Sequence, residues 1–150
     1  MISVKNSKEK ISLFSFLNEI YEKIFTDDVS RKHSNLKKYL EILDNKYLLL
    51  FFKFRTSNHK LPIECGRWQN IEKNRKLCKL CQKQEIGDEF HYIMECPFFK
   101  CKIQLLIKQK YIQNPNMIKF KNLMTSKNRK ELTNMCKLVR EINKGVCAPC

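Results

Sequence analysis

The chain has 150 residues, and its 30 lysines and arginines outnumber its 15 aspartates and glutamates, which gives a formal net charge of +15. This length suits one domain with a modest core and excludes a polymerase or another multidomain enzyme. The hydrophobic fraction of 43% excludes a disordered linker, and the positive charge favours a polyanionic partner such as nucleic acid.

The sequence predicts an intracellular protein, nuclear or cytoplasmic, with no membrane partner. Its longest apolar run, Tyr47 to Phe52, is far shorter than the roughly 20 residues that cross a bilayer. The first ten residues are polar and lack the apolar segment of a signal peptide. In a reducing compartment the 8 cysteines indicate a metal site before they indicate disulfides.

Apolar residues recur at helical spacing in several stretches. The first predicted helix runs from Lys8 to Phe25, and the second from Leu36 to Phe54 after a capping candidate at Ser34. The segment 57–62 should end the second helix, because Ser and Asn favour turns and the residue before a Pro avoids the α region. Three further helices are expected: one after Pro97 whose apolar stripe runs over 103–111 and which ends near Asn114–Pro115, one over 117–124, and one over 127–143 with Gly145 as the final stop.

Three cysteines and a histidine have the spacing of a zinc site. Cys78 and Cys81 form a Cys-x2-Cys pair, and His91 and Cys96 follow with the spacing His-x4-Cys. Two thiolates from a tight turn, completed by an imidazole and a third thiolate, form the tetrahedral set that Zn²⁺ prefers. Four protein ligands leave no position for a water, so the expected zinc site is structural and not catalytic.

Neighbouring residues support this zinc loop and leave one alternative ligand. Gly87 should let the loop turn sharply, and Asp88 is placed to cap a short helix that carries His91. Cys101 could replace Cys96 as the fourth ligand. Cys65 and Cys136 lie among apolar residues and are expected to be packed thiols.

These features predict a mainly α fold in which helices flank a small Cys-Cys-His-Cys zinc-bound loop. The expected organisation is an N-terminal helical segment (1–62), a zinc-binding module (63–101) and basic C-terminal helices (102–150), together forming one compact domain. Residues 97–150 hold 12 basic and 2 acidic side chains, so most of the attraction for phosphate should lie in the last part.

Candidate nucleic-acid-binding residues lie in two groups. The first surrounds the end of the second predicted helix and includes one aromatic ring that could stack on an unpaired base; the alternative is that Trp68 belongs to the core and the charges are only solvated. The second group follows Cys96 and is directed at the phosphate backbone. The two groups are Lys53, Arg55, His59, Lys60, Arg67 and Trp68, and Lys100, Lys102, Lys108 and Lys110.

Two patterns that could indicate catalysis are better explained otherwise. Asp27 and Asp28 follow an aromatic-x step as in polymerase metal sites, but the residues before them predict a helix, so a helix-end turn is expected. Cys147 and Cys150 form a Cys-x-x-Cys pair without the helix that redox chemistry needs. The sequence therefore predicts no enzyme activity.

The sequence resembles the C-terminal zinc-binding region of reverse transcriptases of non-LTR (LINE-type) retrotransposons. The resemblance covers about residues 36–143 and rests on five runs: 53–68, 78–81, 85–97, 114–116 and 123–128. It implies that Cys78, Cys81, His91 and Cys96 are zinc ligands, and that the region helps to hold template RNA or target DNA beside a reverse transcriptase core. The polymerase carboxylates have no counterpart, so the resemblance implies a truncated fragment.

Together these arguments predict a non-catalytic zinc-binding module that binds RNA or DNA, mainly through the phosphate backbone. The alternative is a structural or protein-interaction remnant without a nucleic-acid role, in which amphipathic helices pack on a reverse transcriptase core.

Overall fold

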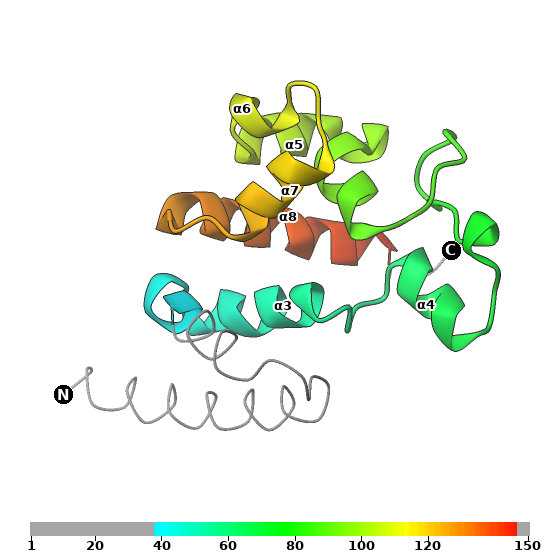
Figure 1. The fold of residues 1–150 in the computed structure, drawn as a ribbon, viewed down its shortest axis with the longest axis horizontal. Coiled ribbons are helices and arrows are strands. Elements are labelled where there is room, and N and C mark those ends of the chain that lie inside the picture. The colour runs from blue at the N-terminus through cyan, green and yellow to red at the C-terminus, as the bar shows by residue number, and fades with distance from the viewer. Residues whose placement is uncertain (1–37, 147–150) are drawn as a thin grey trace. The chain divides into compact units, whose positions relative to one another are not determined.

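The computed structural model describes residues 38–146 (Figure 1). The predicted helix over residues 8–25, the Asp27–Asp28 pair and the Cys147–Cys150 pair lie outside these residues. The described part is mainly helical, as predicted, and contains no strand; its β pairing is limited to one isolated antiparallel bridge between Leu77 and Ile86. The chain divides into two compact units, residues 1–48 and 49–150.

Helical segments follow one another with short connections. The α-helices are α3 (Asn45–Arg55), α4 (Pro62–Trp68), α5 (Lys100–Leu106), α6 (Gln109–Ile112), α7 (Met117–Met124) and α8 (Arg129–Val146). Two short 3₁₀ turns, η1 (Lys73–Arg75) and η3 (Pro97–Phe99), and one π-helical turn, η2 (His91–Glu95), complete the described elements.

The predicted helix over residues 36–54 is interrupted. The structure is helical over 38–42, leaves the helix at Leu43 and Asp44, and begins α3 at Asn45. The backbone carbonyl of Asp44 accepts hydrogen bonds from the N–H groups of Tyr47 and Leu48, at 2.9 and 3.0 Å. Asp favours the start of a helix over its interior, which gives a physical reason for the break.

The end of α3 is a hydrogen-bonded reversal of the chain. The N–H of Asn58 donates to the carbonyl of Lys53 at 2.9 Å, and the N–H of Ser57 donates to the carbonyl of Phe54 at 3.3 Å. Ser57 has a φ of 56°, so this is a Schellman motif with serine in the left-handed position. The predicted end of the helix at segment 57–62 is confirmed, since α3 ends at Arg55. The turn brings Lys53, Asn58 and Lys60 close together in space.

Two helix boundaries differ from the predictions after residue 97, while α7 matches its predicted range. The predicted helix over 103–111 splits into α5 and α6, because Ile107 adopts an extended backbone with φ −103° and ψ 133°. Gly145 does not stop α8, which continues to Val146. A Cβ on Gly145 would lie 3.0 Å from Phe99 Cζ and 3.3 Å from Leu80 Cδ1, so this glycine serves close packing.

The core of the second unit is built around α8, which packs against α5, α7 and η2 (Figure 1). One face of α8 is fully buried at Leu132, Met135, Cys136, Leu138, Val139 and Ile142. Burial of apolar surface at about 25 cal/mol per Å² is the main stabilising term for such a helix. Through Gly145, the same helix also contacts Leu80 in the loop that carries the first cysteine pair.

Candidate metal centre

A small hairpin positions the first two ligands. The bridge between Leu77 and Ile86 closes residues 78–85 into a loop. The N–H of Cys78 donates to the carbonyl of Glu85 at 2.8 Å, and the N–H of Gly87 donates to the carbonyl of Lys76, also at 2.8 Å. Cys78 and Cys81 therefore stand on one tight turn, as their spacing predicted.

Gly87 has a different role from the expected one. Its φ is not positive, and the left-handed residue of this loop is Gln84, with a φ of 54°. A Cβ on Gly87 would lie 2.8 Å from Pro62 Cγ, inside any normal carbon–carbon contact. The glycine therefore lets the hairpin approach the rigid proline ring at the start of α4, and the sharp turn expected of it is made at Gln84.

A capped helical turn positions the other two ligands. The Asp88 side chain accepts a hydrogen bond from the N–H of His91 at 2.8 Å, which confirms the predicted cap. The N–H of Cys96 donates to the carbonyl of His91 at 2.8 Å, the i→i+5 bond of a π turn. In an α-helix, residues five apart would face about 140° away from each other. The wider turn brings Cys96 towards the side of His91.

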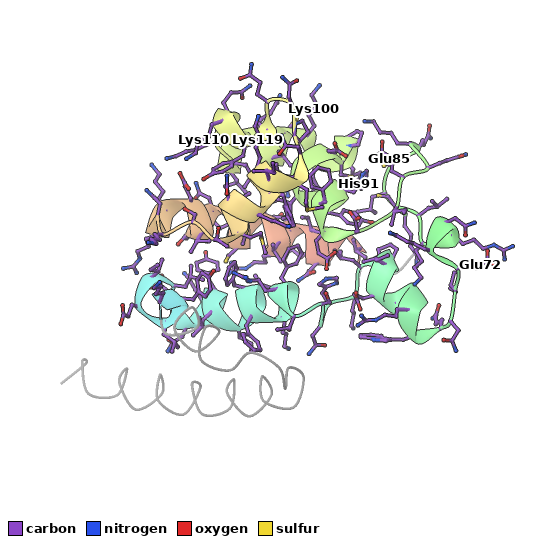
Figure 2. All side chains as sticks on the ribbon, in the orientation of Figure 1. Glu72, Glu85, His91, Lys100, Lys110 and Lys119 are labelled. Carbon is purple, nitrogen blue, oxygen red and sulfur yellow. The ribbon has the colours of Figure 1, made fainter. Side chains whose placement is uncertain are left out.

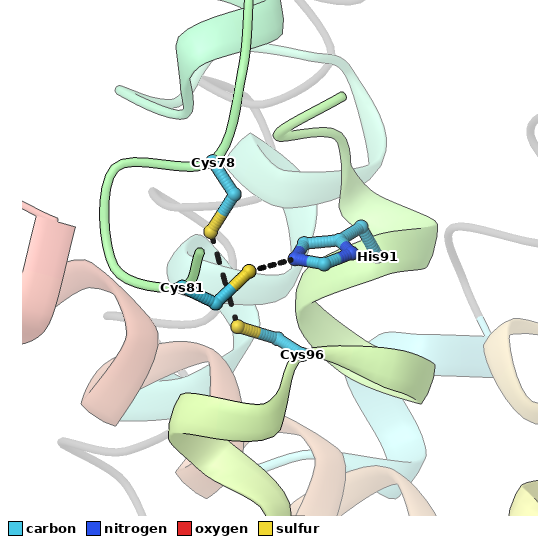
Figure 3. A group of neighbouring side chains, drawn as sticks. All are labelled: Cys78, Cys81, His91 and Cys96. Carbon is cyan, nitrogen blue, oxygen red and sulfur yellow. Dashed lines mark hydrogen bonds between the residues drawn. The ribbon is translucent and has the colours of Figure 1, made fainter. Parts of the chain in front are cut away.

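The four side chains converge on one point (Figure 3). Cys78 Sγ lies 3.9 Å from Cys96 Sγ, and Cys81 Sγ lies 3.4 Å from His91 Nε2. All four ligand atoms lie within 4.8 Å of one another. Typical Zn–S and Zn–N bond lengths give tetrahedral edges of about 3.8 Å between two sulfurs and about 3.6 Å between sulfur and nitrogen. The cysteines are free of disulfides, and the four residues are placed to bind a metal ion.

Glu85 orients the histidine for this role. Its carboxylate accepts a hydrogen bond at 2.8 Å from His91 Nδ1, beside which it lies in Figure 2. With the proton held on Nδ1, the lone pair of Nε2 is directed at the cysteine cluster. Glu85 was not among the site residues predicted from the sequence; the signal available was a carboxylate six residues before His91.

Tyr92 places a hydroxyl against the sulfur cluster. The side chain is fully buried and its oxygen has no ordinary hydrogen-bond partner among the described residues. Burial raises the pKa of the Cys78 thiol, but the nearby Tyr92 hydroxyl and the N–H groups of Leu80 and Cys81 outweigh burial and lower it to about 7. Cys78 is thus held ready to bind a cation as a thiolate.

The neighbouring thiol of Cys96 behaves in the opposite way. Its burial, together with the negative charge of a Cys78 thiolate, raises the pKa of Cys96 to about 12. A divalent cation between the sulfurs removes this repulsion and deprotonates coordinating thiols. The donor set, the orienting carboxylate and the buried hydroxyl all fit a metal ion.

The other cysteines that the structure describes, Cys65, Cys101 and Cys136, lie apart from the cluster. Cys101 is exposed on α5, so the structure places Cys96 and not Cys101 among the four converging atoms. Cys136 is buried in α8, where burial raises the pKa of its thiol to about 12. Cys65 is partly buried and its thiol donates to the carbonyl of Lys60 at 3.3 Å.

Most of the lysines proposed for nucleic-acid binding are exposed. Lys53, Lys60 and Lys100 have no carboxylate partner among residues 38–146. Lys102 pairs with Glu141, while Lys108 and Lys110 both pair with Glu131, at 2.8 and 3.4 Å. Figure 2 places Lys100 and Lys110 along the side of the fold formed by α5, α6 and α7.

The remaining predicted residues lie in three different environments. The Trp68 side chain is 59% exposed, so Trp68 does not belong to the core. Arg67 is exposed and pairs with Glu64, and the exposed Arg55 donates to the carbonyl of Met124 at 3.3 Å. His59 is buried with its Nε2 2.7 Å from Glu89, so its ring is not on the surface where sequence analysis expected it.

No protein-family model matches this chain, and no curated protein or solved structure matches it significantly. Among residues 38–146, no helix combines the length and apolarity needed to cross a membrane.

Proposed function

We propose that this protein is a non-catalytic module that binds RNA or DNA through the phosphate backbone. A structural Zn²⁺ stabilises its basic helical domain. We also propose that the module is related to the C-terminal region of non-LTR retrotransposon reverse transcriptases, which its sequence resembles. The observation that carries the proposed function is a closed Cys3His cluster beside a large surplus of exposed lysines.

Zinc is favoured by the chemistry of the donors. Three sulfurs and one imidazole nitrogen suit a borderline-soft, tetrahedral cation and are poor ligands for Mg²⁺ or Ca²⁺. Four protein ligands leave no coordination position for a substrate or water, so the metal would hold the hairpin of residues 78–85 to the turn of residues 89–96. Its part is structural, and binding free energy becomes folding free energy.

Nucleic acid is favoured by the charge distribution. Residues 49–146 carry 21 lysines and arginines against 8 acidic residues. Several of these carboxylates are engaged within the protein, since Glu85 and Glu89 pair with histidines and Glu131 and Glu141 each pair with two lysines. Within the described residues, the exposed lysines without a carboxylate partner include Lys53, Lys60, Lys79, Lys83, Lys100, Lys121, Lys127, Lys130 and Lys137. Lysine suits phosphate attraction better than base reading, so sequence specificity should be low.

Two measurements test the proposal. Protein purified under reducing conditions should contain one zinc per chain, and a variant with Cys78→Ser and Cys81→Ser should lose both the zinc and the fold. The zinc-loaded wild type should bind single-stranded RNA or DNA with an affinity that falls steeply as salt is raised. A well-folded wild type without zinc, or an affinity independent of salt, would refute the corresponding half.

A protein-interaction module is the second candidate, and several exposed apolar side chains favour it. Leu105 on α5 and Met117 and Ile118 on α7 are 81%, 50% and 72% exposed. Such residues are typical of a surface that packs on another protein, for which the resemblance suggests a reverse transcriptase core. Concentration-dependent self-association in sedimentation, abolished by Leu105→Gln and Ile118→Gln together, would support this function; a monomer at all concentrations would count against it.

A further inference from the structure

A hollow of about 250 Å³ lies between the end of α3, the loop after it and α8. Its polar lining comes from segments far apart in the sequence, because the Schellman turn after α3 folds the chain back while α8 supplies a residue from near its C-terminal end. These polar residues are Lys53, Asn58, His59, Lys60 and Asn143, and the apolar part of the lining is Leu50 and Phe54.

The electrostatics of this hollow favour an anion. Lys53 and Lys60 are exposed, and no carboxylate lines the hollow. Three other hollows formed by described residues each include at least one carboxylate, from Asp88 and Glu89, from Glu131 or from Glu95. Among these four, the hollow at the end of α3 therefore combines lysines with amides and lacks negative side chains.

Two nearby sources of negative potential are hydrogen-bonded to partners of their own. The last carbonyls of α3 would repel an anion, but those of Phe52, Lys53 and Phe54 accept hydrogen bonds from the N–H groups of residues 56–58. The Glu89 carboxylate accepts a hydrogen bond from His59 at 2.7 Å and another from Ser57 at 3.4 Å. The two ammonium groups of Lys53 and Lys60 line the hollow, whereas the Glu89 carboxylate does not.

We propose that this hollow binds a phosphate group of a polynucleotide, with Lys53 and Lys60 as cationic partners and the amides of Asn58 and Asn143 as hydrogen-bond donors. The assignment rests on the proposed nucleic-acid-binding function and names one of its contact points. Two sources share this chemistry: an internal phosphodiester with one negative charge, and a terminal phosphomonoester with nearly two. The buried Phe54 beside the hollow limits water on one side and strengthens the attraction.

Asn143→Asp is the most selective variant, since it replaces an amide by a carboxylate of nearly the same shape. Asn134→Asp is the matched control, because it makes the same change on the same helix at a similarly half-buried position outside the hollow. Both variants should keep one zinc per chain. Asn143→Asp should weaken RNA binding about five- to tenfold, through a lost donor and a new like charge, and Asn134→Asp less than about twofold.

The probe is a short single-stranded RNA labelled at its 3′ end and carrying either a 5′-phosphate or a 5′-hydroxyl. A loss for Asn143→Asp that is confined to the 5′-phosphate RNA identifies a terminal monoester as the ligand, and an equal loss for both RNAs identifies an internal diester. Equal affinities of the two aspartate variants for both RNAs would overturn the phosphate site while leaving wild-type binding, and hence the proposed function, intact.

If the wild type binds neither RNA nor DNA, inorganic phosphate tests the anion site independently of the nucleic-acid-binding function. Stabilisation of the wild type by phosphate against heat, absent in Asn143→Asp and present in Asn134→Asp, would support the anion site although the proposed function had failed. Equal stabilisation of all three proteins would overturn the site as well. A second pair of variants, Lys53→Gln and Lys130→Gln, makes the same comparison with exposed lysines. Both variants lose one positive charge, so Lys53→Gln should lower RNA affinity more than Lys130→Gln does.

Discussion

The hydrogen bond between Glu85 and His91 predicts a graded loss of metal affinity on substitution of Glu85. Replacing such an orienting carboxylate typically lowers metal affinity 10- to 100-fold. The Glu85 side chain is 43% exposed, so water can replace part of its interaction. We therefore expect Glu85→Ala to lower zinc affinity about tenfold, or about 1.4 kcal/mol.

Glu85→Gln should have a smaller effect than Glu85→Ala. The glutamine oxygen can still accept the hydrogen bond from Nδ1, but it lacks the charge that roughly doubles the strength of such a bond. About half the free energy should be lost, which corresponds to a threefold lower affinity on the order of 0.7 kcal/mol. The measurement is a competition titration of zinc against a chromophoric chelator, at a pH where both proteins are folded.

Glu95→Ala is the control for simple charge loss. The Glu95 carboxylate also lies within 4.8 Å of the ligand atoms of Glu85 and His91, but the Nδ1 atom is hydrogen-bonded to Glu85. If orientation of the ring is the cause, Glu95→Ala should bind zinc nearly as tightly as the wild type. Equal losses for Glu85→Ala and Glu95→Ala would refute the orientation argument, because general charge near the cation would then explain both.

Three further predictions concern stability. Gly87→Ala should lower the free energy of unfolding by about 1–3 kcal/mol, since its Cβ would meet the ring of Pro62; chemical denaturation that shows no loss would contradict this. Asp88→Ala should cost about 1 kcal/mol by removing the cap on the His91 N–H, and Asp88→Asn should restore most of it in the same assay. Glu131 is buried, which opposes ionisation, but hydrogen bonds from Lys108, Ser126 and Tyr111 lower its carboxyl pKa to about 2, below the ordinary 4.5. Its stabilising effect is therefore present above about pH 4.5 and lost towards pH 2, so the stability advantage of wild type over Glu131→Gln should narrow over this window, and a constant gap would reject the argument.

Helical periodicity and ligand spacing determined much of what the structure contains. The range of α7 and the break after α3 follow from apolar spacing and turn residues, which act over a few residues of chain. The two ligand pairs and the Asp88 cap were also readable, because Cys78–Cys81, His91–Cys96 and Asp88–His91 are each separated by only three to five residues.

Other features depended on packing between distant segments. Local periodicity does not register the interruption at Ile107, since the same apolar residues would fit an unbroken helix. A glycine often stops a helix, but α8 continues through Gly145 to Val146, and Phe99 and Leu80 occupy the space that a side chain at this position would need. A glycine in the sequence shows only that a side chain is absent. Whether it serves a turn or close packing depends on the residues around it in the fold.

The sequence by itself determined the candidate metal-binding cluster, the helical class and the basic charge, because these follow from local spacing and composition. Only the tertiary structure decided which polar groups meet across the fold. His59 is buried against Glu89 and Trp68 is exposed, although both stand in the same basic segment. Asn143 reaches the hollow beside Lys53 from 90 residues further along the chain. Such pairings depend on how helices pack, and packing is a property of the whole set of side chains and not of any one stretch.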